Sequence, residues 1–210
     1  ADYREKSIKH LNRVISLTER LILKFRPKNI VGIVTNVGGF SIHSFKPKSM
    51  VQSLYEQAFQ SIQELKNPLH IEIWPQTMPP YPWHFGGQRF HNLFTDPTDI
   101  ASWCEKYNMS ICLDVSHTGL YSLVEGRNTE QDLISLMPFS KHYHFADARK
   151  PDGEGLQIGD GVLNYKNLID NFKRTTPDSS FIPEIWQGHK DGGKGFLLAL
   201  NKLNNFFENE

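Results

Sequence analysis

The chain has 210 residues, its 23 lysines and arginines balance its 23 aspartates and glutamates, and 39% of its residues are hydrophobic. A chain of this length builds one sizeable core, so we expect a single domain over residues 1–210. The balanced charge gives no electrostatic reason to bind nucleic acid, and no apolar run approaches the roughly 18 residues that cross a membrane.

Two periodicities alternate along the chain, one typical of amphipathic helices and one typical of buried strands. In chain order, we expect helices near residues 8–22, 50–65, 96–107, 133–137, 165–172 and 196–207. We expect strands at residues 30–35, 69–74, 110–115, 142–147 and 181–185. The strand at residues 30–35 is apolar and β-branched throughout, which predicts burial on both faces.

Helices that alternate with strands across short connections indicate right-handed crossovers and a parallel sheet. Pro183 fits a parallel strand only near the end of that strand, because proline donates no ladder hydrogen bond. Residues 76–95 form the longest irregular stretch, and aromatic residues and prolines are frequent in it. Loops of this length in compact domains are functional or disordered, and the aromatic content favours a lid over the active face.

Residues able to bind a divalent metal ion lie at the ends of four predicted strands. Glu72, Asp114 and Glu184 each occupy one such strand, and His144 with Asp147 occupies a fourth. The carboxyl ends of parallel barrel strands open onto one face, where active sites are assembled. Any one of these acids alone is better explained as a helix cap, but their recurrence at one topological position favours a metal site.

The motifs around these residues resemble the xylose isomerase-like or endonuclease IV-like superfamily. They are Leu113-Asp114-Val115-Ser116-His117, His142-Tyr143-His144-Phe145-Ala146-Asp147, Gly153-Glu154-Gly155 with Gly159-Asp160-Gly161, and Pro183-Glu184-Ile185. The resemblance implies an α/β fold, a parallel TIM-type (β/α) barrel of which this chain carries strands four to eight. Two further stretches, at residues 83–89 and 183–189, resemble isomerase-like domains found with sialic-acid-type synthases.

The resemblance also implies roles for individual residues. It makes Glu72, Asp114, His144 and Glu184 the ligands of one divalent ion, which we expect to be Mn²⁺, Mg²⁺, Co²⁺ or Zn²⁺. His117 and Arg149 become substrate contacts, and Trp83 and Arg89 of the predicted lid are expected to join them. His142 shares a strand face with His144, so we expect it inside the barrel or behind the ligands.

These assignments predict a metal-dependent isomerase or epimerase that acts on a sugar or sugar phosphate. Glu72 and Glu184 would flank the substrate and move a proton through an enediolate. One alternative is an abasic-site endonuclease; resemblance to those enzymes requires an Asp-x-His motif after the metal-binding histidine, which residues 149–155 lack. A second alternative is a non-catalytic sugar-binding domain of a longer biosynthetic enzyme.

The remaining expectations concern the surroundings of the chain. Cys104 and Cys112 are predicted to be buried free thiols, and the charged opening Ala-Asp-Tyr-Arg-Glu-Lys is no signal peptide, so we expect a cytoplasmic protein. A closed barrel of this type has eight strands, and only five are predicted here. We therefore expect an open edge at residues 30–35, closed by a missing N-terminal barrel segment or by a homo-oligomer partner.

Overall fold

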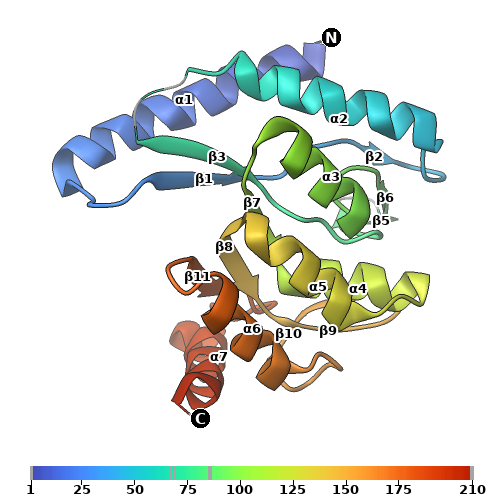
Figure 1. Cartoon of the computed structure of the whole chain (residues 1–210), viewed down its shortest axis with the longest axis vertical. Coiled ribbons are helices and arrows are strands. Elements are labelled where there is room, and N and C mark those ends of the chain that lie inside the picture. Colours follow the sequence, from blue (N-terminus) through green and yellow to red (C-terminus); the bar gives the residue numbers. More distant parts are fainter. Residues whose placement is uncertain (1, 67, 69, 85–86, 209–210) are drawn as a thin grey trace.

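The fold is known from a computed structural model that describes residues 2–66, 68, 70–84 and 87–208. Within these residues, five parallel strands form the central sheet, in the order β1–β3–β7–β8–β11 (Figure 1). They are β1 (Val31–Thr35), β3 (Ile71–Pro75), β7 (Ile111–Asp114), β8 (Ser140–Phe145) and β11 (Ser180–Pro183). The join between β3 and β7 is a single parallel bridge, Gln76 to Cys112. The parallel α/β architecture predicted from the sequence is therefore confirmed.

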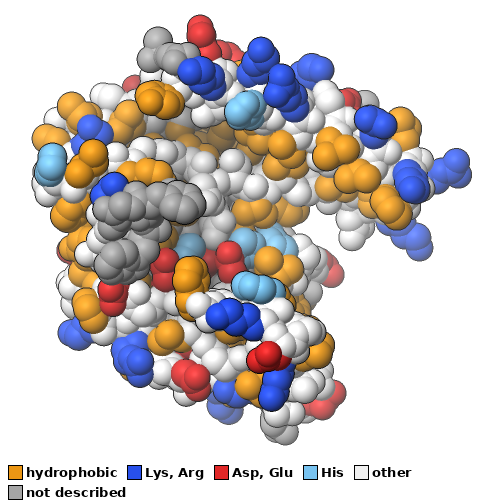
Figure 2. All heavy atoms as spheres, turned by 180° about the vertical axis from the view of Figure 1, so that it is seen from behind, with side chains coloured by type: hydrophobic (Ala, Val, Ile, Leu, Met, Phe, Trp, Pro, Cys, Tyr) orange, Lys and Arg blue, Asp and Glu red, His pale blue; other side chains and the backbone are white. Residues whose placement is uncertain are grey.

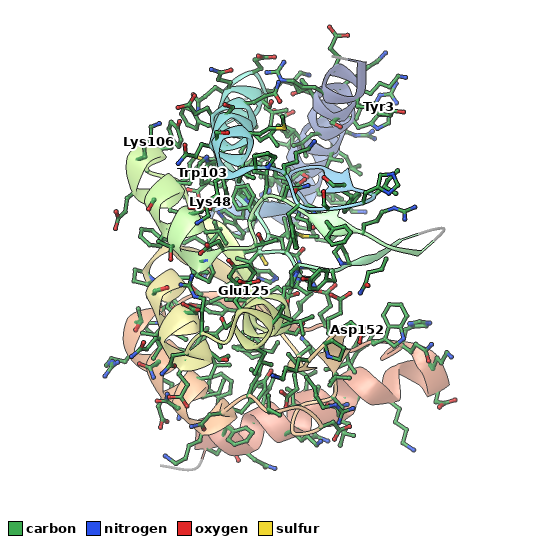
Figure 3. The ribbon with its side chains drawn as sticks, turned by 90° about the vertical axis from the view of Figure 1, so that its right-hand side faces the viewer. Tyr3, Lys48, Trp103, Lys106, Glu125 and Asp152 are labelled. Carbon is green, nitrogen blue, oxygen red and sulfur yellow. The ribbon has the colours of Figure 1, made fainter. Side chains whose placement is uncertain are left out.

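Helices pack on the outside of this sheet and follow the strands in sequence. Helices α1 (Asp2–Phe25) and α2 (Lys48–Gln63) lie over β1 and β3 in Figure 1. The others are α3 (Pro97–Tyr107), α4 (Val115–Glu125), α5 (Thr129–Leu136), the 3₁₀ turn η1 (Met137–Phe139), α6 (Tyr165–Thr175) and α7 (Lys190–Glu208). Figure 3 labels Trp103 and Lys106 on α3; the Trp103 indole donates to the Tyr55 carbonyl (3.1 Å) and Lys106 pairs with Glu56 (3.3 Å), both on α2.

Side chains alternate between the two faces of the strands, as the period of two requires. The outer face packs into two apolar clusters beneath the helices, a small one around Ile15 and Ile33 and a large one around Tyr143 and Phe145. The inner face carries the polar and reactive residues. From β3 to the end of β11 these are Glu72, Cys112, Asp114, His142, His144 and Glu184, and the apolar Trp74 and Ile182 share this face.

Helix α4 was not predicted, and it begins directly at the end of β7 without a connecting loop. Asp114 is both the last residue of the strand and the N-cap of the helix, where its carboxylate accepts the backbone N–H of His117 (3.0 Å). This helix cannot be predicted from its first residues, Val115-Ser116-His117-Thr118-Gly119, because serine, threonine and glycine are typical of a loop. The sequence also gave no sign of the short strands β2 (Phe40–Ser41), β4 (Trp83–His84), β5 (Gly87–Gln88), β6 (Phe90–His91), β9 (Asp147–Arg149) and β10 (Gly153–Leu156).

The long segment after β3 lies at the carboxyl end of the sheet, where a lid was predicted. Its strand β6 pairs antiparallel with β2, which follows the carboxyl end of β1. Aromatic side chains fix the two loops together, since the Phe45 ring meets Phe90 at 5.1 Å and Tyr81 at 5.5 Å between centroids. The βα loops after β1 and β3 thus form one packed unit beside the strand ends.

The sheet does not close into a ring. Among the described strands, β1 has β3 as its neighbour and β11 has β8, so each leaves one side unpaired. The predicted open edge at residues 30–35 is confirmed. The prediction that this strand is buried on both faces is wrong, because only Ile33 of β1 is buried. No helix in the described part of the chain combines the length and apolar character that a bilayer crossing requires.

Candidate metal centre

Three of the four predicted ligands converge at the carboxyl end of the sheet. Asp114 ends β7, His144 lies near the end of β8, and Glu184 directly follows β11. One ligand atom from each lies within 4.8 Å of the others. The His144 Nδ1 is 3.6 Å from an Asp114 oxygen and forms a close ion pair with the Glu184 carboxylate. Figure 2 shows acidic and histidine side chains gathered beside the hollow on this face of the molecule.

Glu72, the fourth predicted ligand, does not join this group, and Gln76 takes its place. Strand β3 runs on to Pro75, so Glu72 lies three residues, roughly 10 Å, before the strand end. Its carboxylate accepts the indole N–H of Trp74 (2.9 Å). The Gln76 amide nitrogen instead lies 3.1 Å from an Asp114 oxygen and 3.1 Å from His144 Nδ1. The placement predicted for Glu72 is therefore corrected to Gln76.

The physical cause of this error is the proline that forms the last residue of β3. Glu72 is the only acid in the run at residues 69–74, and the sequence pattern predicts that this strand ends before Pro75. A proline is compatible with the last residue of a strand, and the next residue then occupies the first position at the barrel mouth. Position alone, directly after Pro75, was the signal that pointed to Gln76.

The Asp114 and His144 side chains shift the pKa values of one another. Burial alone would lower the pKa of the His144 imidazole, but its contacts with Asp114, Cys112 and Glu184 outweigh burial and raise that pKa to about 12. Burial alone would raise the pKa of Asp114, but the facing His117 and His144 hold it well below its ordinary value. Without a metal ion, the protonated imidazole therefore offsets part of the negative charge of the two carboxylates.

The donors present suit a divalent cation. Two carboxylates and an imidazole, with an amide oxygen available from Gln76, form a hard oxygen and nitrogen set typical of Mn²⁺, Mg²⁺, Co²⁺ or Zn²⁺. Two negative carboxylates brought together around one point repel each other unless a cation lies between them. A metal ion would replace the His144 proton in that role, so the residues fit the predicted ion.

A second set of donors lies deeper on the inner face, and it shares His144 with the first. One atom each from Cys112, His142 and His144 lies within 4.8 Å of the others. His142 is held by a 2.7 Å hydrogen bond between its Nδ1 and Ser180 Oγ, and it stacks on Trp74 at 6.4 Å. His142 thus lies inside the sheet's concave face, behind the metal ligands, as predicted.

His117 reaches the centre from the first turn of α4. Its Nδ1 lies 2.9 Å from the Thr77 carbonyl oxygen and 3.4 Å from an Asp114 oxygen. A carbonyl oxygen can only accept, so Nδ1 carries a hydrogen and Nε2 points toward the remaining space. The Thr77 hydroxyl also donates to the Asp114 carbonyl (3.2 Å) and accepts the Asp114 N–H (2.9 Å), which fixes this end of β7.

The other predicted substrate contacts lie outside this group. Arg149 is exposed and reaches the carbonyl of Asp160 at 3.5 Å. Arg89 is half-buried on the lid, and its guanidinium reaches the Gln88 carbonyl at 3.2 Å. The Trp83 and His84 side chains lie outside the described residues, so their predicted proximity to the metal stays a prediction.

Asp147 serves the loop rather than the metal. Its carboxylate is buried and accepts the backbone N–H groups of Ala148 (2.8 Å), Gly159 (2.9 Å) and Leu163 (3.1 Å). A side chain at Gly161 would place its Cβ 2.2 Å from the same carboxylate, which accounts for glycine there. The Asp147 carboxylate therefore fixes the loop that follows β8 through structural hydrogen bonds.

Sequence reasoning missed Glu154, which also faces the centre. It lies in β10, and its Oε2 is 3.8 Å from His117 Nε2. Burial raises the pKa of Glu154, His117 opposes that shift, and the charges of Asp114 and Glu184 add to it. The Gly153-Glu154-Gly155 motif contributes to the family resemblance, and a lone acid between two glycines was the signal available in the sequence.

Comparison with known proteins gives the family. The xylose isomerase-like TIM barrel family matches residues 1–205, and the chain belongs to that family. Among curated proteins, none matches the sequence.

Solved structures share the fold at low sequence identity. A D-tagatose 3-epimerase-like protein is 18% identical with a TM-score of 0.59, over 85% of this chain and 62% of its own. A xylose isomerase domain protein from Alicyclobacillus acidocaldarius is 18% identical with a TM-score of 0.60, over 98% of this chain and 73% of its own. An L-ribulose 3-epimerase is 12% identical with a TM-score of 0.59, over 96% and 60%. The chain thus spans 62% of the first of these structures.

Proposed function

We propose that this chain is the metal-binding part of an isomerase or epimerase that acts on a sugar or sugar phosphate. The observation that carries the proposal is the convergence of Asp114, His144 and Glu184 at the carboxyl ends of neighbouring parallel strands. Active sites of parallel barrels are built at this end. Structures with the same fold include proteins named as a 3-epimerase and a 3-epimerase-like protein, which supports this reaction class.

The chain's own residues provide the groups that such a reaction needs. A bound divalent ion would polarise a substrate carbonyl and make the neighbouring C–H more acidic. The Glu184 side chain is half exposed (51%), so its carboxylate can accept that proton from a substrate lying in the hollow. His117 Nε2 points into the same space and can hold a substrate hydroxyl.

A deuterium-exchange screen tests the proposal. The purified protein is incubated in D₂O with Mn²⁺ and a panel of ketoses, aldoses, aminosugars and their phosphates, and carbon-bound deuterium is followed by NMR and mass spectrometry. We expect deuterium beside the carbonyl of at least one sugar, and loss of this incorporation on removing the metal with a chelator. Tight sugar binding without any exchange would favour a non-catalytic sugar-binding domain instead.

Glu184→Gln tests the role of the base within the same screen. The amide is close in shape to the carboxylate and can coordinate weakly, but it cannot accept a proton. We expect Mn²⁺ binding to weaken only partly while exchange falls by about 10²–10⁴-fold, the usual contribution of a general base. Lys166 and Asp170 form an exposed pair on α6, so Asp170→Asn is a control that should leave exchange unchanged.

A further inference from the structure

Glu154 carries a buried carboxylate oxygen for which the described residues provide no hydrogen-bond partner. The atom is Oε2, and the side chain as a whole is 26% exposed. A buried carboxylate oxygen left without a partner costs free energy, and a ligand or a proton that pairs with it removes that cost. His117 Nε2 lies 3.8 Å from this oxygen, which is too long for a direct hydrogen bond.

The tautomer of His117 makes this gap a place for a hydroxyl group. Nδ1 donates to the Thr77 carbonyl, so in the neutral ring Nε2 presents a lone pair toward Glu154. Two acceptors that face each other across 3.8 Å are satisfied together by one proton or by a donor between them. A sugar hydroxyl that donates into this gap, or a proton held on the Glu154 carboxyl group, meets this requirement.

Backbone hydrogen bonds fix Glu154 between the first turn of α4 and the residues that follow β11. The Gly155 N–H lies 3.3 Å from Ser116 Oγ, next to His117, and the Gly155 carbonyl accepts the Trp186 N–H at 2.7 Å. Gly155 has a φ of +65°, which favours glycine, and a Cβ there would lie 3.3 Å from the Trp186 nitrogen. Asp152, labelled in Figure 3, lies in the turn that leads into this strand. Glu154 is therefore presented between the start of α4 and the residues that follow β11.

The metal centre lacks a second glutamate of its own. Gln76 occupies the position where a fourth ligand was predicted, and an amide cannot accept a proton. Among the residues that the structure describes, Glu184 is then the only glutamate within the converging group. A reaction that removes a proton from one face of a carbon and returns one to the other face needs a second proton-carrying side chain.

We propose that Glu154, assisted by His117, is this second group, and that the reaction is therefore an epimerisation that uses one carboxyl group for each face of the substrate. This inference rests on the proposed function. In the forward direction, Glu184 takes the proton from the C–H bond beside the carbonyl, and the electron pair forms an enediolate. Glu154, in its protonated form, delivers its proton to the opposite face of the same carbon. Solvent then removes the proton from Glu184 and restores the one on Glu154, so the site returns to its starting state.

The two carboxyl groups are distinguished by following deuterium and stereochemistry together in D₂O, with full-length protein and Mn²⁺. For Glu154→Gln, we expect the epimer to form at least about a hundredfold more slowly, while Glu184 still exchanges the starting sugar with retention of configuration. Glu184→Gln should lose both signals from that sugar. Asp160→Asn removes an exposed charge from the same loop and should change neither.

Chemical rescue distinguishes the loss of a proton donor at position 154 from a structural effect of the substitution. Glu154→Ala leaves space for a small acid, and formate should restore epimer formation in this variant without affecting Glu184→Gln. Epimer formation by Glu154→Gln at the wild-type rate, or loss of exchange and inversion together with no rescue by formate, would overturn the inference. Absence of exchange in the wild-type protein on every sugar would instead refute the proposed function itself.

Discussion

The side chain of Gln76 determines how strongly the centre can hold a cation. Replacing its amide by a carboxylate in Gln76→Glu adds a third negative charge next to Asp114 and His144. We expect Mn²⁺ to bind at least about tenfold more tightly, because oxygen ligands with negative charge favour such ions. Without metal, the same charge repels Asp114, so unfolding free energy should fall by about 1–3 kcal/mol. Isothermal titration calorimetry and denaturation with and without Mn²⁺ measure both effects, and a variant that binds no more tightly would exclude Gln76 from the ligand set.

The proton held by His144 predicts how metal binding depends on pH. Its contacts raise its pKa to about 12, so the imidazole is protonated at neutral pH in the metal-free protein. A metal ligand must be deprotonated, so uptake of the ion releases about one proton and affinity should rise about tenfold per pH unit between roughly pH 5.5 and 8. Calorimetry in buffers of different ionisation enthalpy counts the proton. In His144→Ala, binding should weaken strongly and this proton release should vanish; proton release that persists would place the proton elsewhere.

For individual residues, the sequence predicts a ligand wherever strand end and residue type agree. Asp114 ends a four-residue strand and caps the next helix, and both features can be read from neighbouring residues. Glu72 could not be placed correctly, because nothing local shows that β3 continues through Pro75. Glu154 needs knowledge of tertiary contacts, since its partner His117 lies 37 residues earlier in another element.

At the scale of elements, one threonine connects the carboxyl ends of β3 and β7. The Thr77 hydroxyl bonds both backbone groups of Asp114 and also accepts the Thr118 hydroxyl at 3.0 Å. Valine has the same shape but leaves the buried Asp114 N–H without an acceptor. We expect Thr77→Val to lower the unfolding free energy by about 1–3 kcal/mol and to weaken Mn²⁺ binding.

The exposed Thr98 provides the control for this substitution. It lies in the first turn of α3, where its hydroxyl accepts from Arg127 at 3.1 Å. Thr98→Val should change stability by less than about 0.5 kcal/mol, because groups at the surface exchange one partner for water. Equal losses in the two variants, measured by urea denaturation, would show that the Thr77 bonds have no special role in the site.

Most helices and central strands follow from local patterns, whereas the loops do not. The apolar spacing of α1 and the Asp96–Pro97 start of α3 are visible in the sequence, and the Asp96 carboxylate accepts the Thr98 N–H at 2.9 Å. The pairing of β2 with β6 joins Phe40 to His91 and Ser41 to Phe90, which lie far apart in the sequence, and it depends on contacts between two loops. Short strands of this kind have too few residues to show a period of their own.

For the molecule as a whole, the dominant feature is the unpaired outer edge of each of the two strands β1 and β11. Edges of this kind expose backbone N–H and C=O groups that pair readily with another strand. Ile30 beside β1 is 52% exposed and Ile182 in β11 is 43% exposed, which adds apolar surface at both edges. We propose that further parallel strands cover these edges, from an N-terminal barrel segment of the same protein or from a second copy.

The behaviour of the 210-residue chain in isolation tests this proposal. We expect it to self-associate with increasing concentration in analytical ultracentrifugation, and we expect Ile30→Lys to reduce that association because a charged residue protects an edge. Leu198, 45% exposed on α7, is the matched control, and Leu198→Lys should leave association unchanged. Amides of residues 31–35 should exchange with D₂O faster than those of residues 140–145, because β8 has a strand on each side. In a longer protein that supplies the missing strands, exchange at residues 31–35 should slow to match β8. A monomeric 210-residue chain whose β1 amides are already as protected as those of β8 would show that the edge is complete without any partner.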